Sequence, residues 1–336
     1  MPPAAKSRPS QPRIAWLDLF RGAAVLMMIE THVVNSFLTA GLKQSAWFGW
    51  LNYVNGLVAP SFLFIAGFVQ CRGAGSGREV FFAKKAKRLL GIFALGFAIQ
   101  FPIYSLQHGD WTEAVRLGSQ VNILPCLALA LLLLLAAQRL TKMRNAWAVL
   151  IAAMTALVLA LTPFAQSWTH GPVPLVAWVN RSTGSFFPMF PWLAFAFAGG
   201  LAGAFLQTAR QMIFAAVFCA ALMWATCVPG YTGISATFFF QRVMWVLVLA
   251  AAAQPIAKWW TPSLVLFAGR ESLWWYAVHL AVITTLLGNG VPSQLDLMPT
   301  AAIFVGVFSA TWAIVFAKTW WSSRDFKNAV AADISG

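Results

Sequence analysis

Residues 16–37 read WLDLFRGAAVLMMIETHVVNSF. The stretch is long and apolar enough for a membrane-spanning helix, which needs roughly 20 such residues. Ionisable groups inside a membrane are costly and need a partner or a function. The stretch nevertheless carries polar or charged side chains at Asp18, Arg21, Glu30, His32 and Asn35. This combination predicts a helical membrane protein whose first helix supplies part of a functional site.

The composition of the whole chain agrees with this fold class. Of its 336 residues, 60% are hydrophobic and 10% are charged, whereas a soluble domain has about 45–50% and about 25%. These values exclude a disordered chain, a secreted disulfide scaffold and a cytosolic enzyme. The four cysteines form no CxxC pair, and the sequence holds no cluster of metal-binding side chains. We therefore expect neither a disulfide framework nor a metal site.

Apolar stretches recur along the chain and predict an all-α integral membrane protein with about ten transmembrane helices. We expect a single transmembrane domain over 14–321, between a disordered cytoplasmic tail at 1–13 and a short cytoplasmic tail at 322–336. The ten predicted helices are 16–38, 47–70, 86–106, 121–138, 146–165, 185–207, 211–228, 235–256, 263–287 and 298–320.

The distribution of basic residues predicts the orientation. With both termini in the cytoplasm, 18 of the 23 Lys and Arg residues fall on the cytoplasmic side and three lie outside, as the positive-inside rule requires. This bias explains the net charge of +14 without a nucleic-acid partner. We interpret the basic run at 84–88 as an anchor to anionic lipids. The expected location is the inner (plasma) membrane, as a multi-pass protein with the lipid bilayer as a partner.

The polar residues of the first helix form one stripe. Asp18, Arg21, His32 and Asn35 follow steps of three and four residues along it, by way of apolar positions. Arg21 and His32 are eleven residues apart, which is about 20° in phase and roughly 16 Å along the axis. Arg21 therefore lies near the cytoplasmic surface and His32 lies deep, where it can act as a general base. The competing interpretation is a polar seam that joins helices.

A second deep histidine lies in the predicted ninth helix, in GRESLWWYAVH at 269–279. Ser272, Tyr276 and His279 share one face of this helix. His279 is about 24 Å along its helix from the cytoplasmic end, and His32 is about 23 Å along the first helix. We therefore expect the two histidines at similar depth. The competing interpretation of His279 is a hydrogen-bonded strut.

Two further arginines lie within predicted helices. Arg242 and Arg270 keep their charge at any working pH, so each requires a carboxylate, a cage of carbonyls or an anionic ligand. Asn55, on the second predicted helix, is a candidate pocket wall, with packing as the alternative. The irregular stretch STGSFFPMFPW at 182–192 must face protein or water.

Four stretches resemble known membrane acyltransferases. WLDLFRGAAVLMMIETH at 16–32 is similar to the first-helix signature of the acyltransferase-three family, an Arg followed by ten residues and a His. LDLFRG and PSFLFIAGF (60–68) resemble more closely the heparan-alpha-glucosaminide N-acetyltransferase family. FPMFPWLAFAFAGGLAG (187–203) and GRESLWWYAVH are similar to later motifs of that group. The resemblance extends from about residue 13 to 320.

The resemblance implies an enzyme that moves an acyl group, most simply acetyl, from cytoplasmic acyl-CoA to an extracytoplasmic or membrane-associated glycan. Acyl-CoA is then a co-substrate, and no bound cofactor is expected. His32 matches the family's histidine and Arg21 its arginine. Direct transfer and a covalent acyl-His intermediate both stay open. With His279 as a third catalytic candidate, the candidates for binding donor or acceptor are Asp18, Asn35, Asn55, Arg242, Arg270, Ser272 and Tyr276.

Two other function classes compete with the enzyme. The two intramembrane arginines favour a transporter of an acidic solute or a lipid-linked sugar. A catalytically inactive scaffold in an envelope complex is the third hypothesis. The acceptor, the acyl chain length and the oligomeric state do not follow from the sequence.

Overall fold

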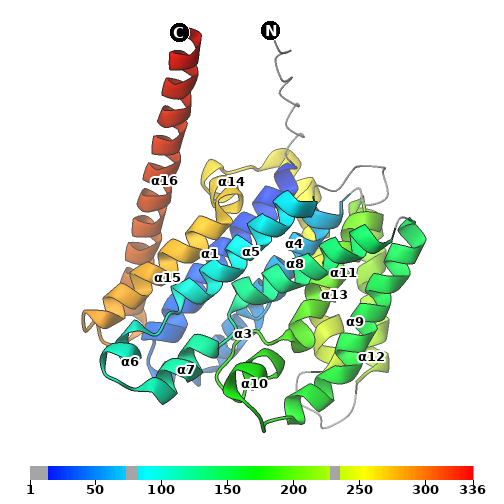
Figure 1. Ribbon diagram of the computed structural model, residues 1–336, viewed down its shortest axis with the longest axis horizontal. Helices are drawn as coiled ribbons and strands as arrows, with labels where there is room; N and C mark the ends of the chain where they lie inside the picture. Colours follow the sequence, from blue (N-terminus) through cyan, green and yellow to red (C-terminus); the bar gives the residue numbers. More distant parts are fainter. Residues whose placement is uncertain (1–13, 73–81, 142, 228–234, 336) are drawn as a thin grey trace.

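The computed structural model describes residues 14–72, 82–141, 143–227 and 235–335. The predicted tail at 1–13 lies outside these residues. The described part is all-helical, with one isolated bridge between Leu38 and Leu295 and no strand (Figure 1). Its helices are α1 (Ala15–Phe37), α2 (Ala40–Lys43), α3 (Ala46–Asn55), α4 (Val58–Cys71), α5 (Phe82–Ile99), α6 (Ile103–Gln107), α7 (Trp111–Ser119), α8 (Ile123–Leu140), α9 (Arg144–Ser167), α10 (Val173–Val179), α11 (Met189–Phe205), α12 (Ala209–Ala225), α13 (Ala236–Trp259), α14 (Ser263–Arg270), α15 (Ser272–Gly288) and α16 (Leu297–Ser335).

All ten predicted segments are helical over most of their length, but several differ from the prediction. The segment at 47–70 is two helices, α3 and α4, and the segment at 263–287 is divided at Glu271 into α14 and α15. The segment at 86–106 ends early, at Ile99, and α11 begins late, at Met189. The backbone of Phe190 is not helical, which agrees with the two prolines around it. The short helix α6 lies at the end of the predicted segment 86–106, whereas α2, α7 and α10 were not predicted.

Helix starts follow from local side-chain chemistry. Asn122 caps α8 by accepting a hydrogen bond from the Leu124 N–H. Thr208 caps α12 through its hydroxyl, and Gln211 bonds back to complete a capping box. Ser235 caps α13 in the same way as Asn122. Such polar side chains satisfy the backbone N–H groups that have no partner at the start of a helix.

Five helical segments in the described residues are long and apolar enough to cross a membrane. Three shorter apolar helices are α11, α12 and α15. The beginning of α1 and the end of α16 lie on the same side of the molecule (Figure 1). The count of about ten spans and the cytoplasmic placement of the termini stay predictions. The five long segments are Ala46–Cys71, Ile123–Leu140, Arg144–Ser167, Ala236–Trp259 and Leu297–Ser322.

Glycines allow two pairs of helices to touch backbone to backbone. At the α4–α11 contact, a Cβ on Gly67 would collide with the Ala196 carbonyl, and one on Gly199 with Phe64. At the α1–α14 contact, a Cβ on Gly22 would collide with Val265. Small residues are typical where membrane helices approach closely. The motif at 60–68 therefore packs on the motif at 187–203, and the first-helix motif packs on the segment that leads into GRES.

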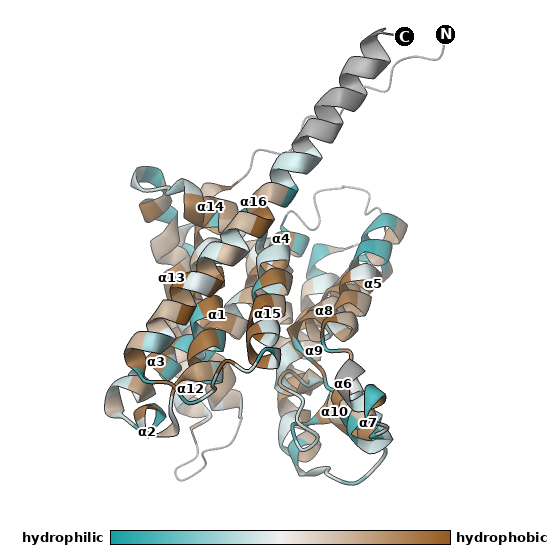
Figure 2. Cartoon of the chain, turned by 90° about the vertical axis from the view of Figure 1, so that its left-hand side faces the viewer, coloured by the Kyte–Doolittle hydropathy of each residue, from teal (hydrophilic) through white to brown (hydrophobic). Residues whose placement is uncertain are grey.

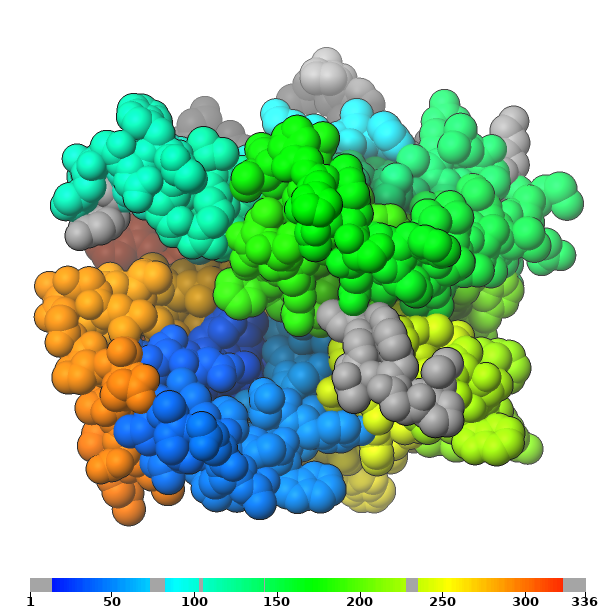
Figure 3. Space-filling model, turned by 90° about the horizontal axis from the view of Figure 1, so that it is seen from below, coloured from blue at the N-terminus to red at the C-terminus, as the bar shows by residue number. Residues whose placement is uncertain are grey.

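Two groups of helices, α1 with α15 and α5 with α8, lie on opposite sides of a cavity, and α4 contacts both groups. Helix α1 packs against α4, α13, α14, α15 and α16, whereas α5 packs mainly against α8. Figure 2 shows α5 and α8 on one side and α1, α14 and α15 on the other. From below, α1 to α3 with α15 form one row, and α6, α7 and α10 form the other (Figure 3). The candidate site lies between the two groups.

Candidate functional site

The two deep histidines are in direct contact. His32 Nδ1 of α1 lies 2.6 Å from His279 Nε2 of α15. The ring planes are 8° from parallel and the centroids are 4.9 Å apart, so the rings meet edge to edge. His279 is fully buried. The equal depth predicted by counting along the two helices is confirmed.

The hydrogen bonds of His279 determine where its proton is. Its Nδ1 lies 2.7 Å from the Trp275 carbonyl oxygen, which can only accept, so Nδ1–H donates. In neutral His279 the other nitrogen, Nε2, is then an acceptor. It accepts from His32 Nδ1–H, and the proton-free nitrogen of His32 is Nε2. A backbone carbonyl thus sets the tautomers of both rings, and His32 Nε2 is left free to take a proton.

Arg21 and Ser272 form a second bridge between the same two helices. Arg21 Nη2 donates to Ser272 Oγ at 2.6 Å. Arg21 precedes His32 by eleven residues, whereas Ser272 precedes His279 by seven. The difference of four residues is about 6 Å of helix rise. The long Arg21 side chain spans this offset, which a short side chain at the same position would not.

The break between α14 and α15 holds two ion pairs. Arg270 Nε lies 3.4 Å from Asp18 Oδ2, and Glu271 Oε2 lies 3.1 Å from Lys318 Nζ of α16. Next to them, a Cβ on Gly269 would collide with the Asp18 carbonyl. In GRES, Gly269, Arg270 and Ser272 therefore contact α1, and Glu271 contacts α16. This packing fixes the start of α15, and with it the position of Ser272.

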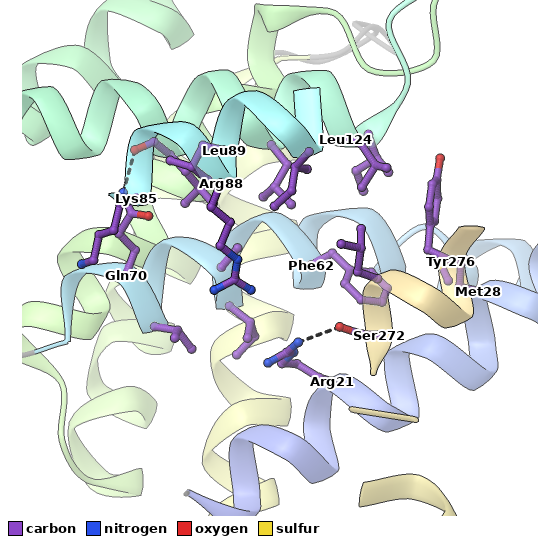
Figure 4. Close-up of a pocket in the computed structure, with 18 residues that line it drawn as sticks. Arg21, Met28, Phe62, Gln70, Lys85, Arg88, Leu89, Leu124, Ser272 and Tyr276 are labelled. Carbon is purple, nitrogen blue, oxygen red and sulfur yellow. Dashed lines mark hydrogen bonds between the residues drawn. The ribbon is translucent and has the colours of Figure 1, made fainter. Parts of the chain in front are cut away.

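A cavity of about 350 Å³ opens between the two helix groups. Most of its wall is apolar and comes from α1, α4, α5, α8 and α15. Figure 4 shows Gln70 and Lys85 at one end, Phe62, Met28 and Tyr276 at the other, and Arg21 and Arg88 between them. The polar and charged lining consists of Arg21, Gln70, Lys85, Arg88, Ser272 and Tyr276.

The cavity stops short of the histidine pair. Neither His32 nor His279 belongs to its lining. Met28 lies four residues before His32 and Tyr276 lies three residues before His279, and both line the cavity. The Tyr276 ring stands edge-on to the His279 ring, with centroids 5.8 Å apart. The histidines thus lie one helical turn beyond the inner end of the cavity.

Of the seven predicted binding residues, Ser272 and Tyr276 line this cavity and five do not. Asp18 and Arg270 form the ion pair at the α14–α15 break, and the other three are Arg242, Asn55 and Asn35. Arg242 Nη1 donates to the Tyr53 carbonyl at 2.8 Å, and its guanidinium lies 4.6 Å from the Tyr53 ring centroid. Asn55 is buried beside the α3–α4 break. Asn35 is exposed. Arg242 is therefore held by one backbone carbonyl and an aromatic ring, which differs from the carboxylate, cage of carbonyls or anionic ligand expected from the sequence.

The sequence did not identify Lys85 and Arg88 as site residues. They belong to the basic run interpreted as a lipid anchor, yet both line the cavity. A signal was present, because Lys85, Arg88, Leu89 and Ile92 follow helical spacing and all four line the cavity. A single sequence does not show which face of a basic helix points inward, so this placement required the structure.

A protein-family model for the catalytic part of heparan-alpha-glucosaminide N-acetyltransferase matches residues 13–242. The match covers well over half of the chain and includes Arg21, His32, Lys85 and Arg88. His279 and Ser272 lie beyond it, and it is the fold that brings them to the matched residues. A comparison with curated proteins found no match.

Proposed function

Because the chain belongs to the heparan-alpha-glucosaminide N-acetyltransferase catalytic-domain family, we propose that it takes acetyl groups from cytoplasmic acetyl-CoA. We propose an extracytoplasmic or membrane-associated glycan as the acceptor and the inner (plasma) membrane as the location. The family itself implies a membrane acetyltransferase. The observation that carries the finer proposal is the histidine pair one helical turn beyond a cavity whose wall carries three cations, Arg21, Lys85 and Arg88.

The cavity suits the donor in charge and in length. Arg21, Lys85 and Arg88 are cations on its wall, and a cationic cleft attracts the phosphates of CoA. Arg21 and His32 are separated by roughly 16 Å along α1. The pantetheine arm has about fourteen bonds from phosphate to thioester carbon, which is about 17 Å at the roughly 1.2 Å per bond of an extended chain. Phosphates at Arg21 therefore place the thioester near His32.

The chemistry follows from the tautomers. His32 Nε2 takes the proton from an acceptor hydroxyl or amine, whose oxygen or nitrogen attacks the thioester carbon. The carbon–sulfur bond breaks and the CoA thiolate leaves, later taking up a proton. His279 is a positioning residue, since its Nε2 stabilises the imidazolium that forms on His32. In the covalent route, Nε2 itself attacks the thioester carbon and the CoA thiolate leaves; the acceptor then takes the acyl group, the acyl–nitrogen bond breaks and the imidazole is restored. Both routes require the tautomer that the Trp275 carbonyl imposes.

The structure gives less support to transport. The transport hypothesis rested on two arginines within helices. Arg242 bonds to the Tyr53 carbonyl and Arg270 pairs with Asp18, so neither requires an anionic solute as a partner. We therefore favour acetyl transfer over solute transport.

The test uses purified full-length protein with radiolabelled acetyl-CoA and follows both binding and thiol release. We expect His32→Ala to bind acetyl-CoA like wild type and to lose at least about 100-fold in turnover, the contribution of a general base. The matched control is His170→Ala, which changes an exposed loop histidine and leaves turnover unchanged. Full turnover in His32→Ala would refute the assignment of the base. If the wild-type protein fails to bind any acyl-CoA, the donor proposal is wrong.

A further inference from the structure

The inner end of the cavity is closed by two side chains from the two helices that carry the histidines. Met28 of α1 is 4% exposed and Tyr276 of α15 is 8% exposed, yet both line the cavity. Each lies about one helical turn before a histidine, on the same face. An acyl group that enters from the end at Gln70 and Lys85 therefore meets Met28 and Tyr276 before it reaches His32.

We propose that Met28 and Tyr276 form a selectivity gate between the donor cavity and the histidine pair, and that Met28 sets the size of the acyl group transferred. This inference rests on the proposed function, because it assumes that the cavity holds acyl-CoA. It adds a specificity determinant, which neither the family match nor the histidine geometry provides.

The two side chains of the gate differ in shape and in contacts. Tyr276 is held on one side by its edge-on contact with His279 and is buried. Met28 is unbranched, with three rotatable bonds, and a thioether side chain adapts readily to a neighbouring group. Met28 is thus the side that yields when a thioester passes, while Tyr276 stays against the histidine that it contacts.

The size of the opening determines which acyl groups pass. A two-carbon acyl group adds only a methyl beyond the thioester carbonyl, whereas each further methylene must find room beside Met28. In a tight apolar site, one methylene changes the specificity ratio by about 10-fold to 200-fold. The wild-type gate therefore favours acetyl over butyryl, and a shorter side chain at residue 28 relaxes that preference.

The experiment compares kcat/KM for acetyl-CoA and butyryl-CoA by thiol release from purified full-length protein. We expect Met28→Ala to raise the butyryl-to-acetyl ratio by about 10-fold or more. Met28→Val, which removes less of the side chain, gives a smaller shift in the same direction and provides a second measurement if the Ala variant does not fold. Met28→Phe narrows the gate and lowers acetyl turnover, while CoA itself binds as in wild type.

Met27→Ala is the matched control, since Met27 is the neighbouring methionine and does not line the cavity. Met27→Ala is expected to keep the wild-type ratio of kcat/KM for butyryl-CoA to kcat/KM for acetyl-CoA. An unchanged ratio in folded Met28→Ala and Met28→Val, with acetyl-CoA still consumed by the wild type, overturns the gate alone. Absence of turnover of every acyl-CoA by the wild type instead overturns the proposed function on which the gate rests.

Discussion

Gly22 is one of the points where α1 and α14 meet backbone to backbone beside the site, so a single added methyl tests how the site is held. A Cβ on Gly22 would lie 2.7 Å from Val265 Cγ1 and 2.8 Å from the Val265 carbonyl carbon. Carbon atoms in favourable contact are about 3.5–4.0 Å apart. Gly22→Ala therefore forces the two helices apart by about 1 Å, because the opposing atoms include backbone.

The separation reaches the site through the neighbours of these residues. Arg21 precedes Gly22, and Ser272 begins the helix after α14. Their hydrogen bond is 2.6 Å long, and a displacement of about 1 Å removes it. A misplacement of this size costs about 100-fold in rate. We expect kcat/KM for acetyl-CoA to fall by about that factor, and overpacking to destabilise the fold by about 1–3 kcal/mol.

The assay pairs tryptophan-detected thermal unfolding with thiol release from acetyl-CoA. Gly306→Ala is the control, because Gly306 lies in helix α16 and a Cβ there meets nothing within 4 Å. The same substitution at that position favours the helix by about 1 kcal/mol, so its effect on stability has the opposite sign. If Gly22→Ala has the same thermal unfolding temperature and the same kcat/KM as Gly306→Ala, the close approach of α1 and α14 does not position Arg21.

Two further predictions concern the charged residues. Arg88→Gln is expected to raise KM for acetyl-CoA about 10-fold with little change in kcat, because a contact to a CoA phosphate is lost. For the same reason the variant's KM depends less on salt concentration. An unchanged salt dependence would place the CoA phosphates elsewhere. Arg242→Met is expected to leave acetyl-CoA binding intact and to change the thermal unfolding temperature instead, because the partner of Arg242 is the Tyr53 carbonyl. Equilibrium binding and thermal unfolding, measured on the same variant, separate the two effects. A loss of acetyl-CoA binding would contradict this structural role.

The helices could be predicted because their apolar stretches are long. What the sequence did not reveal is where helices break. The break at Glu271 follows a segment with no proline, and its cause is tertiary. Glu271 pairs with Lys318 and Arg270 with Asp18, contacts between residues far apart in the chain. At Gly56 a local signal was present, because Pro60 has no N–H to bond the Gly56 carbonyl and its ring crowds that carbonyl. Arg242 also bonds the Tyr53 carbonyl just before this break.

The candidate site was predicted where counting along a helix was enough. Counting predicted similar depth for His32 and His279, and helical phase placed Ser272 and Tyr276 on the same face as His279. The contact between the two histidines came from the structure. Counting could not tell which face of α5 points inward, so Lys85 and Arg88 were missed. It also gave no lateral position to Arg242 or Asn55, which lie on helices whose neighbours only the fold defines.

The two bridges between α1 and α15 make the site sensitive to chain length. One residue removed between Ser272 and His279 would turn His279 by about 100° and draw it back about 1.5 Å, away from His32, while Ser272 stayed with Arg21. An equivalent deletion in the other helix would do the same from the opposite side. The intervals of eleven and seven residues are therefore a joint signature. A related sequence that keeps both histidines but changes either interval has lost the contact between them, although each histidine would still align with its counterpart here.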